Sequence, residues 1–379
     1  MQGRHRLLVL VVMGVVVLAA CGEDTGGGGT TDDGGTTAEE CETVDPVRLQ
    51  LQWVAQSQFA GYYVARDLGF YEDQCLEVEI LEGAVEIVPQ TVLASGGAEF
   101  GIAWVPKALV SRNEGADIIN VAQVFERSPT LMVSFVDAGI TSVADFAGKQ
   151  VGNWGFGNEY ELTAAIEQEG IADQVELVAQ NFDMLALLNG DIDVAEAMVY
   201  NEYAQVLEAE NPETGELYQP EDLNVIDFND VGTAMLQDGL WVNADWIADE
   251  ANVDITERFL YASFQGWGHC LENFDECVEV VLNNGSTLGE SHQQWQLNEI
   301  LGLIYPSSGG IGVMHEDLWA QTVEIATSQI VELQGVEISP DSYRSDIASA
   351  AVERLEADGI DVMGEGYERR EIELRPGGG

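Results

Sequence analysis

The chain has 379 residues, of which 67 are Asp or Glu and 14 are Lys or Arg, so its formal net charge is −53 at pH 7. This charge excludes nucleic acid as a partner, because no basic patch is present to meet phosphates. Salt near molar concentration screens such a charge over a few ångströms. We therefore expect a salty habitat and a halophilic protein, with an acidic surface kept for solubility as the alternative.

Residues 1–21 are typical of an export signal. Arg4 and Arg6 precede an apolar run from Leu7 to Leu18, which is too short to span a membrane comfortably and suits a secretory signal peptide. The following LAAC resembles the lipobox of bacterial lipoproteins, so Cys21 is expected to become the lipidated first residue of the mature chain. An uncleaved membrane anchor is the alternative, and it too would leave the protein outside the cytoplasm.

Residues 22–45 are rich in Gly, Thr and acidic side chains and are expected to form a flexible tether between the lipid and the folded domain. The more than 330 residues from Cys41 onward are enough for two lobes and a large core. Hydrophobic content of 46% with mean hydropathy of −0.01 is typical of a soluble domain, and no later apolar run reaches the length of a membrane span.

Four cysteines remain after Cys21 is assigned to lipid: Cys41, Cys75, Cys270 and Cys277. An exported compartment permits disulfides. Six residues separate Cys270 from Cys277, so a local bridge between them is favoured, and Cys41 would then pair with Cys75. Metal binding by His269 with Cys270 and Cys277 is the rival interpretation, although no second pair of Cys or His residues stands at ligand spacing.

Strand and helix patterns alternate from Val47 to about residue 199, which predicts parallel sheets with crossover helices. The expected strands are 47–53, 75–81, 99–103, 118–125, 130–136, 150–152, 175–179 and 194–199. The expected helices between them are 58–69, 88–94, 106–113, 142–147, 161–169 and 184–188. The last third reads as mainly helical, because apolar residues recur there every three or four positions. Its expected helices are 254–264, 275–282, 291–303, 318–333 and 342–356.

This order of elements predicts an α/β protein of two lobes. Residues 46–136 form the first part of lobe I, and residues 137–233 form lobe II. The chain then crosses back near residues 233–243, so that residues 234–362 complete lobe I with a mainly helical part. Residues 363–379 are expected to be a frayed tail.

The stretch GKQVGNWGFGNEYE at residues 148–161 predicts a strand, a turn and a helix N-terminus. In open α/β sheets, ligands bind beyond the carboxyl ends of the strands, where such helix starts also point. Four expected strands end in an aromatic residue of this kind: Trp53, Trp104, Trp154 and Tyr200. Polar or aromatic candidates beside them are Phe156, Asn158, Glu159, Asn201 and Glu202.

Ring faces and carboxylates together suit a flat heterocycle with an exocyclic amine, whereas the carboxylates would repel an anion such as a sulfonate. Phe59 and Tyr62 on the first helix are further candidates, and Trp241 could close the cleft from the hinge side. For each aromatic residue the alternative is ordinary core packing, which is the common fate of Trp and Phe.

Short segments in a fixed order also carry a family resemblance. They are LQW at 51–53, FAGYYVA at 59–65, GFY at 69–71, GGAEFG at 96–101, FAGKQVG at 146–152 and DIDVA at 191–195. The chain resembles the substrate-binding proteins of ABC importers in the thiamine-pyrimidine synthase-like group, from about Val47 to Trp241. The resemblance implies a type II periplasmic-binding-protein fold, and it implies ligand contacts at Trp53, Trp154, Glu159 and Glu202.

The resemblance implies an extracytoplasmic, monomeric receptor that delivers its ligand to a membrane permease and needs no cofactor. The expected ligand is a pyrimidine precursor of thiamine, with riboflavin and sulfonate or nitrate as alternatives within the same class. The group also has an enzyme branch that makes the thiamine pyrimidine with pyridoxal phosphate and a run of cysteines. This chain departs from that branch, because its cysteines are not clustered and its only lysines are Lys107 and Lys149.

Overall fold

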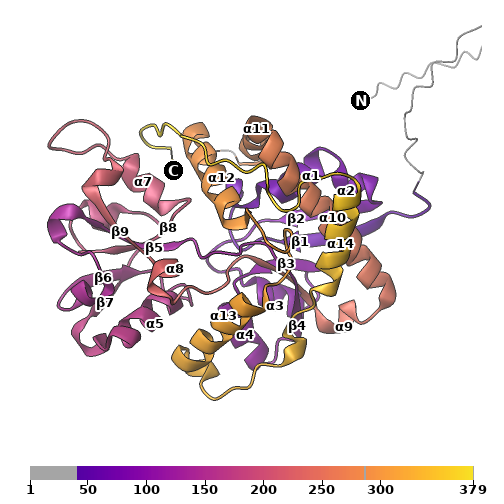
Figure 1. Ribbon diagram of the computed structural model, residues 1–379, viewed down its shortest axis with the longest axis horizontal. Helices are drawn as coiled ribbons and strands as arrows, with labels where there is room; N and C mark the ends of the chain where they lie inside the picture. The colour runs from indigo at the N-terminus through magenta and orange to yellow at the C-terminus, as the bar shows by residue number, and fades with distance from the viewer. Residues whose placement is uncertain (1–40, 286, 379) are drawn as a thin grey trace, which may run out of the picture. The chain divides into compact units, whose positions relative to one another are not determined.

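The computed structural model describes residues 41–285 and 287–378, so the expected signal peptide, lipobox and most of the tether lie outside the described residues. Lobe I is built on a five-stranded sheet of order β2-β1-β3-β10-β4 (Figure 1). Its strands are β1 (Asp45–Gln50), β2 (Leu76–Leu81), β3 (Phe100–Ala103), β4 (Ile118–Gln123) and β10 (Gly239–Asn243).

The expectation of a wholly parallel sheet is wrong for lobe I. Strands β1, β2 and β3 are parallel, whereas β10 is antiparallel to both β3 and β4. Strand β10 arrives from lobe II and begins with Gly239 beside Ala103, the last residue of β3. Because it enters at the edge where β3 ends, it has to run in the opposite direction.

Helices from the two ends of the chain cover this sheet. The early ones are α1 (Ala60–Asp67), α2 (Phe70–Asp73), α3 (Pro89–Ala94) and α4 (Val105–Asn113). Those that follow the return to lobe I are α9 (Ala244–Ile247), α10 (Glu250–Glu272), α11 (Phe274–Asn284), α12 (Glu290–Ile304), α13 (Glu316–Gln329) and α14 (Asp346–Ala357). Helix α10 packs so closely on α1 that a Cβ atom on Gly266 would lie 2.1 Å from the Gly61 carbonyl oxygen. Two glycines are therefore what allows this helix pair to approach.

Lobe II holds a three-stranded sheet of order β8-β5-β9 and a parallel pair, β6 and β7, joined to it by a bridge between Val151 and Val194. Its strands are β5 (Thr130–Phe135), β6 (Gln150–Asn153), β7 (Glu176–Ala179), β8 (Ala195–Met198) and β9 (Leu223–Asp227). Its helices are α5 (Tyr160–Glu169), α6 (Leu185–Leu188), α7 (Glu202–Leu207) and α8 (Phe228–Val231). Here too the parallel expectation is partly wrong, because β5 is antiparallel to both β8 and β9.

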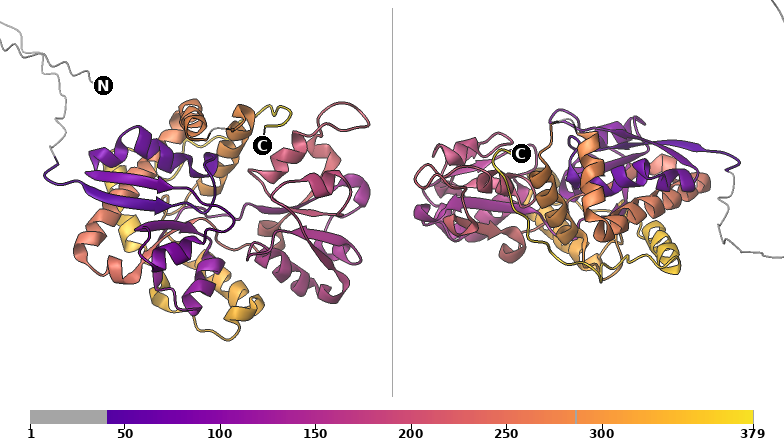
Figure 2. Two further views of the ribbon diagram at one scale, coloured as in Figure 1. Left: turned by 180° about the vertical axis from the view of Figure 1, so that it is seen from behind. Right: turned by 90° about the horizontal axis from the view of Figure 1, so that it is seen from above.

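Two segments connect the lobes, residues 124–129 on the way out and residues 232–238 on the way back (Figure 2). Glu161 on α5 ties them together, because its carboxylate accepts hydrogen bonds from Ser128 Oγ at 2.7 Å and from the Met235 backbone N–H at 2.6 Å. Burial raises the pKa of Glu161 to about 7. A single side chain of lobe II thus contacts both crossing segments.

Residues 364–378 pack on both lobes, so the expectation of a frayed tail is wrong. The Arg370 backbone N–H donates to Asn298 Oδ1 of α12 at 2.8 Å. Further along, Leu374 packs against the apolar core of lobe II, and Gly378 is buried. The yellow C-terminal segment in Figure 1 accordingly runs past α12 toward α7.

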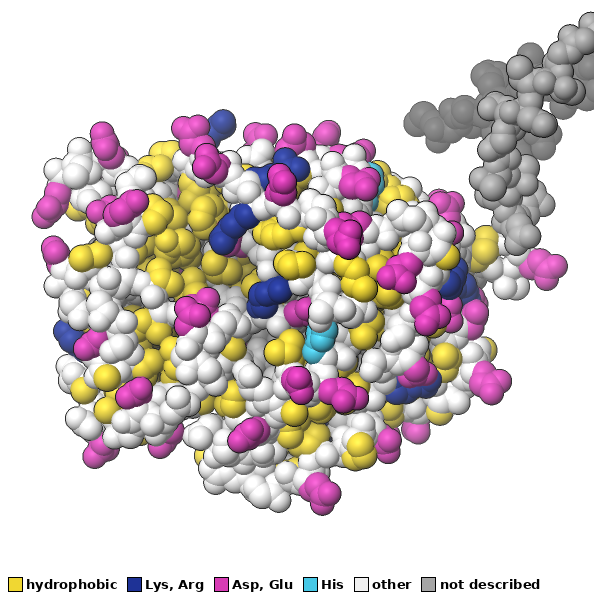
Figure 3. Space-filling model, viewed as in Figure 1, with side chains coloured by type: hydrophobic (Ala, Val, Ile, Leu, Met, Phe, Trp, Pro, Cys, Tyr) yellow, Lys and Arg dark blue, Asp and Glu magenta, His cyan; other side chains and the backbone are white. Residues whose placement is uncertain are grey.

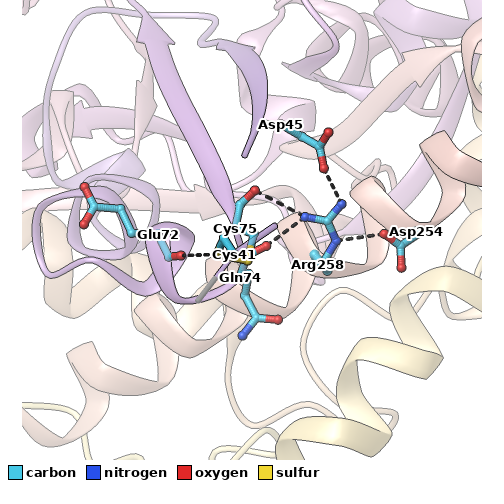
Figure 4. The surroundings of a disulfide bond; sticks show 7 residues. All are labelled: Cys41, Asp45, Glu72, Gln74, Cys75, Asp254 and Arg258. Carbon is cyan, nitrogen blue, oxygen red and sulfur yellow. Dashed lines mark hydrogen bonds and ion pairs between the residues drawn. A yellow bond between two sulfur atoms is a disulfide. The ribbon is translucent and has the colours of Figure 1, made fainter. Parts of the chain in front are cut away.

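Two disulfides are present among the described residues, and both pair the cysteines that the sequence favours. Cys270 of α10 and Cys277 of α11 are joined with a Cα–Cα distance of 5.6 Å. Cys41 and Cys75 are joined across 5.7 Å and link the segment before β1 to the residue before β2. Figure 4 shows Arg258 of α10 beside this second bridge, where its guanidinium donates to the carboxylates of Asp45 and Asp254 and to backbone carbonyls near Cys75.

Acidic side chains are spread over the face of the molecule seen in Figure 3, with few Lys and Arg between them. This distribution is what the net charge of −53 requires, since a carboxylate is costly to bury without partners. In the part of the chain that the structure describes, no helix is long and apolar enough to cross a membrane.

Candidate ligand-binding site

A cavity of about 340 Å³ lies between the two lobes and is lined by residues of both. It sits at the carboxyl ends of five strands, because Trp53, Trp104, Trp154, Phe182 and Tyr200 follow β1, β3, β6, β7 and β8 and all line it. Five rings from separate strands therefore share one space. Their flat faces are suited to a flat aromatic ligand.

Phe182 joins the rings of the two lobes, and the sequence analysis missed it. Its centroid is 5.0 Å from the Trp53 ring at an interplanar angle of 48°, and 5.9 Å from the Trp154 ring at 14°. Trp53 belongs to lobe I, whereas Phe182 and Trp154 belong to lobe II. Like the other four rings it follows a strand, β7, and its position three residues beyond that strand's expected end, Ala179, was a signal that could have found it.

The backbone around Trp154 is held by polar groups. Its N–H donates to Glu196 Oε2 at 3.0 Å, and its indole N–H donates to the Asn181 carbonyl at 3.1 Å. The next three residues all have left-handed backbone, with φ of 70° at Gly155, 58° at Phe156 and 83° at Gly157. A non-glycine residue is strained there, and the turn leaves Phe156 78% exposed at the edge of the cavity.

Asn158 lines the cavity, but Glu159 does not. The Glu159 carboxylate instead accepts the Gly157 backbone N–H at 2.9 Å and so closes the turn before α5. The predicted ligand contact at Glu159 is therefore not supported by its position. Asn158 accepts a hydrogen bond from Lys107 Nζ of lobe I at 2.7 Å.

Tyr200, Asn201 and Glu202 all line the cavity, as expected from their place after β8. Glu202 is buried, and its carboxylate accepts the Met198 backbone N–H at 3.0 Å and Asn201 Nδ2 at 2.8 Å. Burial raises its pKa. A carboxylate has about four acceptor positions, so Glu202 can still accept a hydrogen bond from a ligand amine.

A cluster of polar side chains around Asp238, on the lobe I side of the cavity, was not predicted. Gln52, Gln58 and Trp104 all donate to the carboxylate of Asp238, at 2.7 Å from Gln58 Nε2 and 2.9 Å from Trp104 Nε1. Burial raises the pKa of Asp238 to about 6. Asp238 precedes β10, and it reaches the carboxyl ends of β1 and β3 only because β10 runs antiparallel to β3. Asp238 could not be predicted from a sheet that was expected to be wholly parallel.

Besides Glu159, three predicted ligand contacts lie away from the cavity. Phe59 and Tyr62 are buried in the core of lobe I, where Tyr62 packs edge-on against Trp267 with centroids 5.8 Å apart. Trp241 is fully buried, and its indole N–H donates to the Ala103 carbonyl at 3.0 Å. Core packing, the alternative considered for each aromatic residue, is therefore what the structure shows at these three positions. The helix or strand that carries each residue directs its side chain into the core.

Side chains of α12 extend the contacts between the lobes beside the cavity. His292 Nδ1 lies 3.0 Å from Glu208 Oε1, and its Nε2 lies 2.8 Å from Asn201 Oδ1. Both His292 and Glu208 are buried. The Trp295 indole N–H donates to the Val199 carbonyl at 2.9 Å. Helix α12 of lobe I thus contacts the same segment of lobe II that supplies Tyr200 and Glu202.

Two α/β lobes joined by two crossing segments, with a ring-lined cavity between them, define the periplasmic-binding-protein fold. The solved structures agree: the chain is similar to the periplasmic aliphatic sulphonate binding protein SsuA of Escherichia coli, with a TM-score of 0.57 at 14% identity. The match covers 88% of this chain and 95% of that one. The fold expected from the sequence is thereby confirmed.

The particular family follows from the sequence matches. The model of the NMT1/THI5-like family matches residues 56–277, and the chain belongs to this family. It is 24% identical over 295 residues to a formylaminopyrimidine-binding protein of Halalkalibacterium halodurans, covering 76% of this chain and 86% of that protein. It is 25% identical over 301 residues to the riboflavin-binding protein RibY of Chloroflexus aurantiacus, covering 74% and 80%. The resemblance found in the sequence is confirmed.

Proposed function

We propose that the chain is the solute-binding component of an ABC importer and that it captures a flat aromatic heterocycle, in the first place a pyrimidine precursor of thiamine. The observation that carries the proposal is the cavity in which rings of lobe I, Trp53 and Trp104, meet rings of lobe II, Trp154, Phe182 and Tyr200. The names of the two relatives, one binding a formylaminopyrimidine and one riboflavin, support a ligand of this shape.

Capture requires no chemical step. A heterocycle stacks between the rings while its edge donors reach Glu202 and Asn201, and the lobes close around it about residues 124–129 and 232–238. The closed, loaded form is then recognised by a membrane permease. A lipid on Cys21 would keep the protein at the outer side of the cell membrane, as a monomer beside that permease.

Two alternatives of the same class differ in the ligand. Riboflavin is flat and rich in edge donors and acceptors, as a pyrimidine is. The two ligands therefore differ mainly in size, and the volume of the cavity is what would discriminate between them. A sulfonate or nitrate needs cationic donors, and among the described residues that line the cavity Lys107 is the single basic side chain. The alternative to a binding protein is a different class of function, namely an enzyme of the same family.

The proposal is tested by isothermal titration of the purified protein with a formylaminopyrimidine, 4-amino-5-hydroxymethyl-2-methylpyrimidine, thiamine, riboflavin and an alkanesulfonate. We expect saturable binding of at least one pyrimidine without turnover of the ligand. Binding of the alkanesulfonate alone, or conversion of a ligand to product, would reject it.

Truncating Trp154 to Ala should weaken binding of the best pyrimidine at least about tenfold, a loss of about 1.4 kcal/mol, because one stacking face is removed. Glu202→Gln should weaken an aminopyrimidine by a similar factor, since a neutral amide holds the exocyclic amine less well. Leu185→Ala, on the exposed side of lobe II, is the matched control and should bind as the parent does. Unchanged isotherms for both site variants would place the ligand elsewhere.

A further inference from the structure

Lys107 lines the cavity, but the proposed stacking of rings gives it no role. It lies in the first turn of α4 in lobe I. Its ammonium donates to Asn158 Oδ1 of lobe II at 2.7 Å and lies 4.2 Å from the centroid of the Trp104 ring. The side chain is therefore held by one hydrogen bond and one cation–π contact.

The ammonium has donor capacity to spare. A lysine ammonium carries three N–H groups and no acceptor, and Asn158 is the one hydrogen-bond acceptor that it contacts in the described part of the chain. No carboxylate of a described residue lies within ion-pair distance of it. At least one N–H group is thus available to a molecule in the cavity.

The charges around Lys107 determine its state. Burial lowers the pKa of Lys107 to about 8, an effect that the carboxyl groups of Glu196, Glu159 and Asp238 partly offset. Asp238 is already held by Gln52, Gln58 and Trp104, and burial raises the pKa of Glu196 to about 8. At neutral pH the ammonium is mostly charged, and its nearest acids are occupied or largely protonated.

A ligand that fills the cavity would remove water from this ammonium. An unpaired buried cation is costly, so the ligand that fits best is one that brings an oxygen acceptor to it. Glu202 is an acceptor, so it would bind an N–H donor at another point of the ligand edge. The two side chains together therefore suit a heterocycle that carries both an oxygen acceptor and an N–H donor.

We propose that Lys107 is a specificity-determining residue that selects heterocycles carrying a carbonyl oxygen, which accepts a hydrogen bond from its ammonium. The inference rests on the proposed function, since it assigns the substrate class of the same cavity. It favours an aminopyrimidine that bears a formyl group, and the dioxopyrimidine ring of a flavin, over 4-amino-5-hydroxymethyl-2-methylpyrimidine, whose only oxygen is a hydroxyl and so a weaker acceptor than a carbonyl.

The test crosses two ligands with four proteins by isothermal titration at pH 7. The ligands are a formylaminopyrimidine and 4-amino-5-hydroxymethyl-2-methylpyrimidine, and the proteins are the parent, Lys107→Met, Lys107→Arg and Lys149→Met. We expect Lys107→Met to weaken the formyl ligand about tenfold or more and to change the hydroxymethyl ligand less than about threefold. Lys107→Arg should retain most of the affinity, and Lys149→Met, which changes the chain's other lysine outside the cavity, should bind as the parent does.

A pH profile supplies a second readout that does not depend on the Met variant folding. The parent should lose affinity for the formyl ligand as pH rises from 7 to 9, through the pKa of Lys107 near 8, whereas Lys107→Arg should lose less, because only groups that both proteins share, such as Glu196, then titrate in this range. A guanidinium stays charged over this range, so the difference between the two profiles reports the lysine and not Glu196, Glu159 or Asp238.

The outcomes separate the two proposals. If the parent binds these ligands but Lys107→Met weakens both equally, or weakens neither, the selection by Lys107 is wrong and the proposed function stands. If the parent binds neither pyrimidine nor riboflavin, both proposals are wrong. If Lys107→Met removes binding of an alkanesulfonate while the formyl ligand is unaffected, the ammonium serves an anion and the inference is overturned.

Discussion

Glu196 on β8 shows how one buried residue supports the cavity without lining it. Its Oε2 atom accepts the Trp154 backbone N–H, and its other oxygen has no partner among the described residues. Burial raises its pKa from the usual 4.5 to about 8. At neutral pH the carboxyl group is therefore mostly protonated, and it holds the turn that presents Trp154 to the ligand.

A raised pKa in the folded state makes stability depend on pH. The folded protein holds this proton more tightly than the unfolded chain, so the contribution of Glu196 is complete below pH 4.5 and is lost as pH rises through about 8. Glu196→Gln mimics the protonated form, and its melting temperature should fall less than that of the parent between pH 5 and pH 8.5. The difference should be on the order of 1 kcal/mol or more in the free energy of unfolding.

Glu176→Gln, on the exposed part of β7, is the matched control and should keep the parent's slope. Thermal melts at four pH values measure the effect. Identical slopes for Glu196→Gln and the parent would show that the Glu196 carboxyl does not titrate in this range.

Among single residues, the sequence correctly predicted the cavity residues where an aromatic residue follows a strand. Trp53, Trp104, Trp154 and Tyr200 line the cavity because the carboxyl ends of strands from both lobes meet there. Phe59 and Tyr62 could not be separated from them by residue type, since an aromatic residue in an amphipathic helix serves a core as readily as a cleft. Only the packing of α10 on α1 shows that this face is covered.

At the scale of single elements, the direction in which a strand runs in its sheet could not be predicted from the sequence. Alternating strands and helices indicate crossovers, but they do not reveal that β10 and β5 enter their sheets from the other lobe and run antiparallel. Strand β9 was missed because the apolar residues in its five positions, Leu223, Val225 and Ile226, do not keep a period of two. The C-terminal segment was missed because its polar residues find partners far away in sequence.

That segment connects elements of both lobes, and its removal is a direct test. Arg370 holds it on α12, and Leu374 packs on lobe II. Deleting residues 372–379 should leave both lobes folded but favour their separation, with a larger radius of gyration by X-ray scattering and roughly threefold or greater weakening of ligand binding.

Replacing Glu373 with Gln, an exposed residue of the same segment, is the matched control and should change neither quantity. A truncated protein with the parent's scattering curve and affinity would show that the segment contributes nothing to closure.

Over the whole molecule, the net charge of −53 is the dominant property. In dilute buffer these charges repel one another and oppose the compact state, and salt near molar concentration screens them over about 3 Å. The melting temperature should therefore rise by several degrees or more between 0.05 M and 2 M KCl. Sucrose at matched osmolality serves as the control for effects that do not involve charge.

Maximum stability in dilute buffer would reject the saline habitat. The buried acids do not change this expectation, because Glu161, Glu196 and Asp238 have raised pKa values and add less charge than their number suggests.

The bridge between Cys41 and Cys75 has a mechanical consequence. It lies where β1 and β2 begin, whereas the cavity lies where the strands end. Tension applied to the polypeptide ahead of Cys41 would reach the starts of β1 and β2 together, so the bridge would keep the two strands from sliding past each other along their ladder of six paired residues. A tethered protein could thus be pulled at one end of this sheet while the rings at the other end keep their places.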